Sequence, residues 1–491
     1  MERSISILKF GGTSVGNGER IRQVAQIVAH QAQQFEEDFP AVVVSAMAGV
    51  TDQLLRITRA ITTGEIEISR REIDALKVKH REAAELVSAT PEIHAELLAT
   101  LTDAFVHFEQ DVVRLHTAVA TSDDVALRTA AVAAWGERLS VLLVAAAIRG
   151  CGIAAEAVRE EVIRIEVPRS EMPYEPGTVI GAEPLAAETR ENAARLVAPL
   201  LERGAVPVMA GFIGRTRSGI VATLGRNGSD YSAAVIGAAL DCAQVEIYTD
   251  VDGVLSADPR IVPNARLLPR LSYAEAAQLS WFGAKVLHPR TLIPLATRNV
   301  PVRVRNTFRP QARGTIVGPA GKQRSGATAI TVRRQLALIT VESRHLFGAS
   351  ENVGQIFALA ARAGITPVAV CSSSGHHLAF MVEEHMAASV IELLQHDKEN
   401  WQVTSKGGLA ACACIGSGFT SSPMSPARAV TALAREHIPV ITQGASDLGI
   451  ILIVEDRDSE RALRSLHRDL IAPVIPLVRH HAQEKRREAA R

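Results

Sequence analysis

The alternation of hydrophobic and polar positions divides the first third of the chain into short strands and longer helices. Residues 5–10 form a short apolar stretch typical of a strand, and residues 19–34 repeat apolar side chains at helical spacing. The continuous apolar run at 41–47 is typical of a strand buried in a parallel sheet. The stretch 52–149 is alanine-rich, helical in its pattern and without a strand signal. These patterns predict a strand–helix–strand beginning followed by a helical block.

Strand signals return beyond the helical block, at 205–214, 220–225, 245–250 and 300–306, with helical stretches between several of them. Strands that alternate with helices indicate an α/β domain with a largely parallel or mixed sheet. We expect this domain to end near residue 320, because the stretch 318–328 is polar and contains glycines, as linkers do.

The last third of the chain contains an internal repeat. LALITV begins at Leu336 and LAACACI begins at Leu409, 73 positions later, and Ile365 and Ile438 correspond at the same offset. HLAFMVEE and GIILIVED match at an offset of 72. Each copy reads strand, helix, strand, strand, helix and needs one further strand to close a βαββαβ sandwich. We therefore predict three domains, which cover residues 1–320, 330–400 and 401–480.

Composition narrows the class of partner. The chain has 491 residues, 53 Lys and Arg against 53 Asp and Glu, and only 4% aromatic residues. A net charge of zero argues against nucleic acid and anionic membrane surfaces, and the scarcity of aromatic side chains argues against base stacking. No apolar run reaches the length of about 18 residues that a membrane span needs. We expect no nucleic-acid partner and no membrane partner.

The cysteines and the N-terminus indicate a cytoplasmic location. Five cysteines without a CxxC pair argue against a disulfide framework or a zinc site. Cys412 and Cys414 are two positions apart on an expected strand, so both should face one side as small buried residues. The N-terminus runs directly into a strand and shows no signal-peptide pattern.

Two glycine-containing turns after strands could carry chemistry. Lys9 is followed by Phe10, Gly11 and Gly12, a turn in which exposed backbone N–H groups and a lysine could hold a phosphate; a purely structural turn is the alternative. No GxxxxGK[ST] motif occurs. In the turn 224–230, Arg226 could bind a carboxylate through its planar guanidinium group. Asp230 stands at the start of an apolar helix, where capping the helix is the alternative role.

Two further clusters lie beyond the second turn. The acidic stretch 249–253 and Asp258 could hold Mg²⁺, although turn-forming aspartates explain them equally well. In the stretch 282–289, Lys285 follows a glycine, and His288 precedes a proline and is expected to be structural. Together, the four clusters supply the charge neutralisation and positioning that phosphoryl transfer to an anionic acceptor requires.

Six motifs resemble those of aspartokinases in order and spacing: KFGGTSV at 9–15, SAMAGVTD at 45–52, WGERLS at 135–140, LGRNGSDYSAA at 224–234, TDVDGVLSADPR at 249–260 and FGAKVLHPRTL at 282–292. The resemblance covers essentially the whole chain, because aspartokinases also carry tandem ACT regulatory modules. The chain is most similar to the kinase part of bifunctional aspartokinase–homoserine dehydrogenases, and its length leaves no room for a dehydrogenase domain.

The resemblance implies a fold and a reaction. The fold is the α/β amino acid kinase fold, an α/β sandwich, followed by tandem α+β ACT-like βαββαβ modules. The substrates are ATP, used with Mg²⁺, and L-aspartate, and the products are 4-phospho-L-aspartate (β-aspartyl phosphate) and ADP. This reaction is the first step of lysine, threonine and methionine biosynthesis.

The resemblance also implies roles for individual residues. Lys9 neutralises the charge that develops on the transferred phosphoryl group, beside the amides of Gly11 and Gly12, and Asp230 orients Lys9. The implied aspartate-binding residues are Thr51, Glu137, Arg226 and Ser229. The implied nucleotide-binding residues are Ser45 near the transferred phosphate, Thr249, Asp250, Leu255, Arg260, Lys285 and Val286. Leu255 stands where aspartokinases commonly have a tyrosine, so any hydroxyl contact there is lost.

The ACT resemblance implies regulation and self-association. Loops are expected before the first helix of each module, at 347–354 and 418–426, where backbone N–H groups could hold the carboxylate of a free amino acid. Ser350, Asn352 and Val353 are the candidate effector residues. Threonine is the favoured feedback inhibitor and lysine the second candidate, and a homodimer or higher homo-oligomer is expected through the modules.

Two alternatives remain open. Another amino acid kinase, acting on glutamate, acetylglutamate or uridylate, would share the first glycine turn. The SAMAGVTD and WGERLS motifs and the doubled C-terminal module favour aspartate. A catalytically dead amino-acid sensor is the second alternative, and the presence of Lys9, Arg226, Asp230 and Lys285 argues against it.

Overall fold

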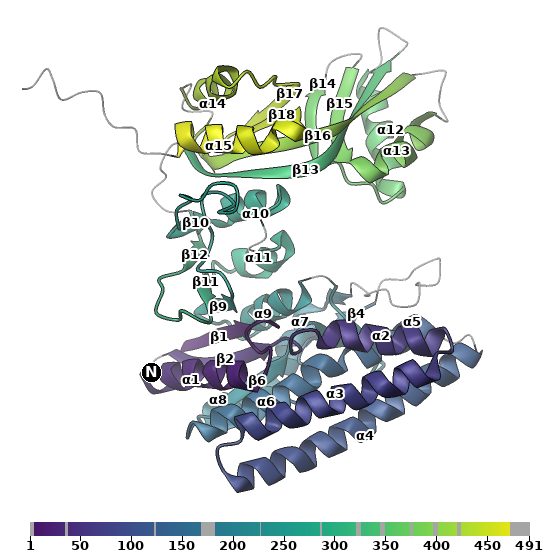
Figure 1. Cartoon of the computed structure of the whole chain (residues 1–491), viewed down its shortest axis with the longest axis vertical. Helices are drawn as coiled ribbons and strands as arrows, with labels where there is room; N and C mark the ends of the chain where they lie inside the picture. The colour runs from purple at the N-terminus through teal and green to yellow at the C-terminus, as the bar shows by residue number, and fades with distance from the viewer. Residues whose placement is uncertain are drawn as a thin grey trace, which may run out of the picture. The chain divides into compact units, whose positions relative to one another are not determined.

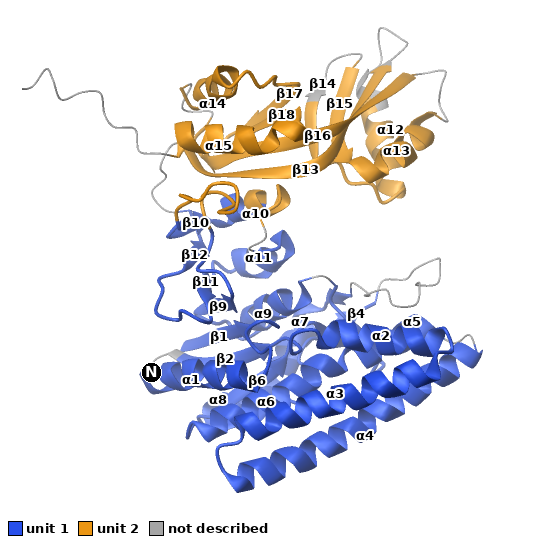
Figure 2. Cartoon of the chain, in the orientation of Figure 1, with its two compact units in different colours: residues 1–254, 267–277, 285–321 blue, residues 255–266, 278–284, 322–491 orange. Residues whose placement is uncertain are grey.

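The computed structural model divides the chain into two compact units (Figure 2). Unit 1 contains residues 1–254, 267–277 and 285–321, and unit 2 contains residues 255–266, 278–284 and 322–491. The structure describes residues 4–34, 38–121, 124–167, 182–225, 227–284, 287–320, 326–343, 349–373, 377–395, 401–419 and 424–471.

An eight-stranded sheet forms the centre of unit 1, in the order β10-β12-β11-β9-β1-β2-β6-β3. Its strands are β1 (Ser4–Phe10), β2 (Asp38–Val44), β3 (Ala155–Ala157), β6 (Val206–Ala210), β9 (Gln244–Thr249), β10 (Arg270–Ser272), β11 (Val302–Asn306) and β12 (Thr315–Gly318). All neighbours are parallel except β11 and β12. The expected mixed, largely parallel sheet is confirmed, and β1 lies inside it because Ile7 and Leu8 are fully buried.

The helices that lie next to this sheet form two groups (Figure 1). The helices of this part of the chain are α1 (Gly18–Gln34), α2 (Val50–Thr62), α3 (Ile66–Val87), α4 (Pro91–Thr121), α5 (Val125–Ala133), α6 (Trp135–Gly150), α7 (Ala186–Leu196), α8 (Ala198–Glu202), α9 (Gly228–Ala239), α10 (Tyr273–Trp281), whose last residues from 278 on belong to unit 2, and α11 (Pro289–Ala296). Helices α1 and α6 pack together against β2, β3 and β6, while α7, α9 and α11 form a second group that packs on β1 and β9. Two small sheets, β4 (Ile165–Glu166) with β5 (Glu183–Pro184) and β7 (Ile213–Arg215) with β8 (Val221–Thr223), complete the unit.

The helical block expected at 52–149 is confirmed as α2 to α6. Helix α6 is apolar on almost every side because it lies between the sheet and the outer helices α3 and α4. The stretch Val125–Gly150 is long and apolar enough to cross a membrane by composition alone, but 83% of its most apolar window is buried inside the structure. It is therefore a core element of unit 1.

One six-stranded antiparallel sheet forms the centre of unit 2, in the order β14-β15-β13-β16-β18-β17. Its strands are β13 (Gly326–Ser343), β14 (Ala369–Ser373), β15 (His377–Glu383), β16 (Trp401–Ser417), β17 (Thr442–Ser446) and β18 (Gly449–Glu455). The helices are α12 (Ala349–Arg362), α13 (Ala387–Gln395), α14 (Met424–Arg435) and α15 (Ser459–Leu470), with single 3₁₀ turns at Glu384–Met386 and Asp456–Asp458.

The internal repeat is confirmed as two modules that share their long strands. Leu336 of β13 pairs directly with Leu409 of β16, so the two copies meet at equivalent residues. The second half of β13 and the first half of β16 belong to the first module. The second half of β16 begins the second module, and the first half of β13 closes it. The further strand that each βαββαβ copy needs is thus one half of the long strand with which the other copy begins.

Each module has its own hydrophobic core. The first core includes Ile365 and Phe380, and the second includes Ile438, Cys412 and Cys414. Both cysteines are fully buried, which confirms that they act as small apolar residues. All five cysteines of the chain are free thiols.

Two segments from the first two-thirds of the chain belong to unit 2. Ala257 and Val262 are part of the core of the second module. The backbone oxygen of Phe282 accepts a hydrogen bond from the Thr331 hydroxyl group (3.1 Å), and the indole N–H of Trp281 donates to the Val368 oxygen (2.8 Å). These segments overlap the TDVDGVLSADPR and FGAKVLHPRTL motifs, so parts of both motifs are packed into unit 2.

Candidate active site

A cavity of about 350 Å³ lies in unit 1 where β1 and β2 end. Its walls come from the end of β1, the turn between β2 and α2, the start of α6 and the start of α9. The lining residues are Lys9, Gly12, Ser45, Ala46, Met47, Ala48, Gly49, Thr51, Asp52, Glu137, Phe212, Asn227, Gly228, Ser229 and Asp230. The carboxyl ends of strands are where α/β folds place their ligands. Seven residues singled out from the sequence therefore meet in one place.

Lys9 and Asp230 form an ion pair in this cavity. Their Nζ and Oδ1 atoms are 2.5 Å apart, and their side chains are 9% and 17% exposed. Asp230 is the third residue of α9, and Asn227 with a φ of 57° occupies the cap position. The capping alternative for Asp230 is therefore wrong, because Asn227 occupies the cap position. The Asp230 carboxylate lies in the first turn of α9, where the helix dipole favours anions, and it pairs with the Lys9 ammonium group.

Glu137 reaches the cavity because the residue before it is a glycine. A Cβ atom on Gly136 would lie 2.7 Å from the Cβ of Ala46, so only glycine lets α6 approach the β2–α2 turn this closely. Oε1 of Glu137 then accepts a hydrogen bond from the Ala46 backbone N–H at 3.0 Å. Its Oε2 atom is buried and has no hydrogen-bond partner in the described part of the chain.

The environment of Glu137 changes its protonation. Burial raises the pKa of this carboxyl group to about 8, against the opposing effects of the Ala46 N–H and the Lys9 charge. Glu137 is therefore mostly protonated at neutral pH in the free protein. An ammonium group placed beside Oε2 would favour the ionised form, so the site is suited to the amino group of an amino acid.

The first glycine turn is built against β9. The Gly11 backbone N–H donates to the Tyr248 oxygen at 3.3 Å, and the Ser14 hydroxyl group donates to the same oxygen, also at 3.3 Å. Of the two glycines expected beside a phosphate, Gly12 lines the cavity and Gly11 is engaged with β9. Lys9 thus stands at the end of a strand whose turn is held in place by Tyr248.

The residues expected to bind the nucleotide are distributed over both units. Thr249 ends β9 and donates to Asp250 Oδ1 at 3.1 Å. Leu255 and Arg260 belong to unit 2, where Arg260 is exposed and pairs with Asp258 at 2.6 Å. Among the described residues, no group of three or more His, Cys, Asp or Glu side chains could hold a metal ion.

Three of the expected site residues lie outside the described residues: Arg226, Lys285 and Val286. Their roles in binding aspartate or the nucleotide remain predictions from the motifs. His288, in contrast, is clearly structural. It caps α11, and its Nδ1 atom accepts a hydrogen bond from the Arg290 backbone N–H at 3.2 Å.

The candidate effector residues lie in a helix, which corrects the expected loop at 347–354. Helix α12 begins at Ala349, so Ser350, Asn352 and Val353 are all in its first turns. Gly354 does not interrupt this helix, because Val353 and later residues at helical spacing face the first core. The side chains of Ser350 and Asn352 lie outside the described residues, and Val353 is partly buried against the core.

Phe212 is a cavity residue that the motifs did not reveal. Its backbone is left-handed, with a φ of 66°, and its N–H donates to the Ser232 hydroxyl group at 2.8 Å. A Cβ atom on Gly228 would lie 2.7 Å from the Phe212 ring, so this glycine gives the ring its place. Positive φ is rare for a bulky residue, and no local sequence signal predicts it.

Comparisons with known proteins match both halves of the chain. The amino acid kinase family matches residues 4–306, and an ACT domain matches residues 413–470. The bifunctional aspartokinase/homoserine dehydrogenase of Haemophilus influenzae is 31% identical over 478 residues, which cover 94% of this chain and 56% of the relative. Aspartokinase 3, chloroplastic, of Arabidopsis thaliana is 30% identical over 490 residues, covering 94% of this chain and 80% of that protein.

Solved structures agree with this result. The crystal structure of Escherichia coli aspartokinase III in complex with aspartate and ADP matches with a TM-score of 0.76 and 28% identity, over 95% of this chain and all of that one. The same enzyme in complex with lysine and aspartate matches with a TM-score of 0.72 and 29% identity, over 95% of this chain and 99% of that one. The chain spans about half the length of the bifunctional relatives it matches. Across both its kinase and its ACT regions, the chain belongs to the aspartokinase family.

Proposed function

We propose that this protein transfers the γ-phosphoryl group of ATP to the β-carboxylate of L-aspartate, forming 4-phospho-L-aspartate and ADP. One observation carries the proposal: the Lys9–Asp230 ion pair lines the same cavity as Glu137, whose Oε2 atom is buried without a partner in the described part of the chain. The first suits a transferring phosphoryl group and the second suits an amino-acid ammonium group. The Escherichia coli relative, whose structure is described as a complex with aspartate and ADP, supports the choice of substrates.

Lys9 supplies the charge that the transfer needs. An ionised carboxylate oxygen attacks the γ-phosphorus, the bond from that phosphorus to the bridging oxygen breaks, and ADP leaves with the bonding electrons. The carboxylate is already nucleophilic, so the reaction calls for charge neutralisation and alignment and needs no strong base. Asp230 keeps the Lys9 ammonium group in the cavity, and the N-terminus of α9 adds a favourable dipole for the anionic groups.

Glu137 binds the amino end of the substrate. Its free Oε2 atom accepts from the aspartate ammonium group, while Oε1 stays bound to the Ala46 N–H. Thr51 and Ser229 line the same cavity and add hydroxyl groups, and Arg226 is assigned to a substrate carboxylate by its motif. Mg²⁺ is expected with the ATP phosphates, which supply part of its oxygen ligands, so no dedicated protein cage is required.

The regulatory half is proposed to bind an aspartate-derived amino acid that inhibits the kinase. The ACT match at 413–470 supports regulation by an amino acid. Threonine is the first candidate and lysine the second, and the relative solved with lysine supports the second candidate. A homodimer or higher oligomer formed through the modules, in the cytoplasm, completes the proposal.

A coupled ADP-release assay tests the reaction. Aspartate, glutamate and N-acetylglutamate are compared at equal concentration with ATP and Mg²⁺, and ADP release is expected with aspartate. Absence of aspartate-dependent release would refute the proposal. Calorimetry that showed amino-acid binding without ATP·Mg²⁺ binding would favour the sensor alternative.

The same assay tests regulation. Lysine, threonine and methionine are added singly and in pairs, and inhibition that corresponds to a coupling free energy of about 1–3 kcal/mol is expected from threonine or lysine. Activity that is insensitive to millimolar amounts of all three, alone and combined, would overturn the regulatory part and leave the kinase reaction in place.

A further inference from the structure

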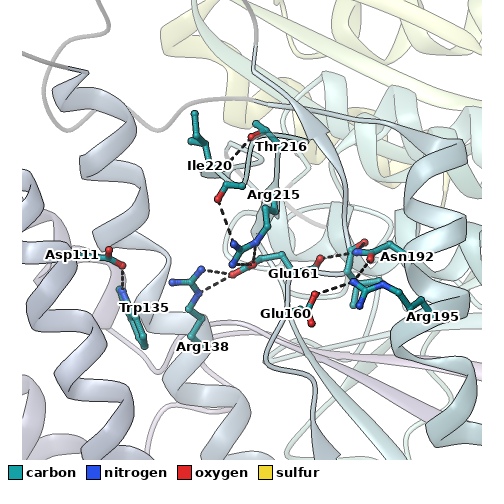
Figure 3. Close-up of polar contacts among 12 residues, drawn as sticks. Asp111, Trp135, Arg138, Glu160, Glu161, Asn192, Arg195, Arg215, Thr216 and Ile220 are labelled. Carbon is teal, nitrogen blue, oxygen red and sulfur yellow. Dashed lines mark hydrogen bonds and ion pairs between the residues drawn. The ribbon is translucent and has the colours of Figure 1, made fainter.

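A buried ion cluster lies in unit 1, outside the cavity that holds Lys9. Glu161 stands between Arg138 and Arg215, as Figure 3 shows. Arg138 Nε donates to Glu161 Oε1 at 2.8 Å, and Arg215 Nε donates to Glu161 Oε2 at 2.7 Å. Each arginine also contacts its oxygen through Nη2. The carboxylate is therefore held by two guanidinium groups, one on each oxygen.

The three side chains are buried to different extents. Glu161 is 1% exposed, Arg138 17% and Arg215 34%. Burial alone would raise the pKa of Glu161, but the two arginine charges and their hydrogen bonds outweigh it and lower the pKa. Glu161 is therefore ionised at neutral pH, and its loss would leave two neighbouring cations without their shared anion, a costly arrangement in a buried cluster.

Arg138 connects the cluster to the helix that carries Glu137. The two residues are adjacent in the first turn of α6. The Arg138 guanidinium group also lies over the Trp135 ring, 4.9 Å from its centre, and the Trp135 indole N–H donates to Asp111 Oδ2 at 2.9 Å. The start of α6 is thus anchored to α4 on one side and to Glu161 on the other.

Arg215 connects the cluster to the opposite wall of the cavity. It ends β7, which begins directly after Phe212 and pairs with β8, Ile213 opposite Thr223. Strand β8 leads into the turn before α9, whose first residues line the cavity. The Arg215 backbone N–H also donates to the Ile163 oxygen at 2.9 Å, so β7 runs along the segment that carries Glu161.

The segment around Glu161 is itself fixed from α7. The Asn192 side-chain N–H₂ group donates to the backbone oxygens of Glu161 and Val162, both at 2.9 Å. The adjacent Glu160 faces away and pairs with Arg195 at 2.9 Å, with a side chain that is 57% exposed. Glu161 therefore has a fixed backbone and two charged partners on separate elements.

We propose that Glu161 is a positioning residue that sets the separation of the two walls of the aspartate site. Through Arg138 it fixes the α6 turn that carries Glu137, and through Arg215 it fixes the β7–β8 hairpin that carries Phe212 and leads to α9. Glu161 itself is not among the residues that line the cavity with Lys9. This inference rests on the proposed function, because its effect is defined by aspartate binding.

The test is the variant Glu161→Gln, which keeps the shape of the side chain and removes its charge. We expect KM for aspartate to rise about tenfold or more, with KM for ATP within about twofold of the unaltered protein. The shift in Tm caused by aspartate should shrink, while the shift caused by ADP should remain. Glu160→Gln makes the same chemical change one position earlier, in an exposed pair, and should leave both KM values unchanged.

Two results would overturn the positioning role. One is an aspartate KM in Glu161→Gln equal to that of the unaltered protein. The other is a parallel rise of both KM values, which would indicate general loosening of the fold. If Glu161→Gln does not fold, the variant Arg215→Met replaces it in the test. This variant removes the pair between Arg215 and Glu161 and leaves the pair with Arg138, and a rise in KM for aspartate without a rise in KM for ATP is again the expected result. Absence of aspartate turnover in the unaltered protein would overturn the proposed function and the positioning role with it, whereas turnover with an unaffected variant overturns the positioning role alone.

Discussion

At the end of β1, Lys9 carries a positive charge into the cavity, and Asp230 balances it. Replacing Lys9 with alanine removes a contact that is strongest when charge develops on the transferred phosphoryl group. We expect kcat to fall about 100-fold or more while the protein stays folded. Lys77→Ala, which removes a lysine paired with Glu109 on the α3 surface, serves as the control and should leave kcat unchanged. A kcat for Lys9→Ala within a few-fold of the unaltered protein would contradict the assigned role.

Glu137 makes stability depend on pH. Its pKa is about 8 in the folded state and 4.5 for an exposed glutamate. Between these values the unfolded chain releases the proton and the folded protein keeps it, so the free energy of unfolding falls as pH rises from about 4.5 to 8. Glutamine does not titrate. The Tm of Glu137→Gln relative to the unaltered protein should therefore increase from pH 5 to pH 8.5.

Thermal melts without aspartate, recorded across this pH range, measure the effect. A Tm difference that does not change with pH would mean that Glu137 ionises normally in the folded state. The same variant should lose the stabilisation that aspartate gives, because the oxygen for the ammonium group is gone. At alkaline pH, Glu137→Gln should therefore gain thermal stability relative to the unaltered protein and lose affinity for aspartate.

Residues that line the cavity and stand in sequence motifs could be predicted from the sequence. Residues that only position those cavity residues could not. Lys9, Ser45, Glu137 and Asp230 stand in motifs, and the structure brings them to one cavity. Glu161 is 23 positions from Arg138 and 54 from Arg215, and nothing in its own neighbourhood indicates that both converge on it. Such a cluster exists only once three elements are packed together.

At the scale of elements, the contact between α6 and the β2–α2 turn depends on Gly136. In Gly136→Ala the new Cβ would lie 2.7 Å from Ala46 Cβ, inside any normal contact, so α6 must move away. We expect a lower Tm and a rise in KM for aspartate of about tenfold, because Glu137 moves with the helix. Kinetics and melts measure both effects. Gly150→Ala, at the other end of α6, also clashes with an alanine Cβ, at 2.9 Å, and should lower Tm without the change in KM. Equal kinetic effects of the two variants would contradict a local role for Gly136.

Most helices and strands follow from local periodicity, and the exceptions have a physical cause. The expected helix 19–34 is α1, 18–34, and the expected strand 300–306 contains β11, 302–306. Strand β13, in contrast, begins at Gly326, ten positions before the repeat was recognised at Leu336. Its register shifts between Arg333 and Leu336, and Gln335 is left-handed with a φ of 59°. This bulge interrupts the alternation by which strands are recognised.

At the scale of the whole molecule, one hydrogen bond connects a motif loop to the last helix of unit 2. Ser256 and His467 are both buried, and Ser256 Oγ lies 2.9 Å from His467 Nε2. The same Oγ accepts a hydrogen bond from the Arg266 backbone N–H at 2.9 Å. Burial, followed by the Arg266 charge, lowers the pKa of His467, which keeps the ring neutral. The loop 255–266 is thus fixed to α15.

Ser256→Ala should therefore affect the nucleotide more than aspartate. The loop carries Leu255 and Arg260, which are proposed nucleotide contacts, and the variant removes the hydrogen bond between residue 256 and His467. We expect KM for ATP to rise about threefold or more, with KM for aspartate unchanged. Ser465→Ala removes another buried hydroxyl group of α15, bonded to the Ala432 oxygen at 3.0 Å, and serves as the control. A larger effect on aspartate than on ATP would contradict the assignment.

The shared strands β13 and β16 also constrain how such a chain can be made and can change. The second module is finished only when α15, which ends at Leu470, packs on β13, whose first half is synthesised before the first module. A nascent chain that stops before Trp401 exposes a long edge of β13, the kind of edge that invites pairing with other chains. The first module is contiguous, from the second half of β13 to the first half of β16, but it is inserted between the parts of the second module, which is closed by the first half of β13. Recombination that deletes, duplicates or exchanges one module would therefore have to cut β13 and β16, the strands that the other module also uses.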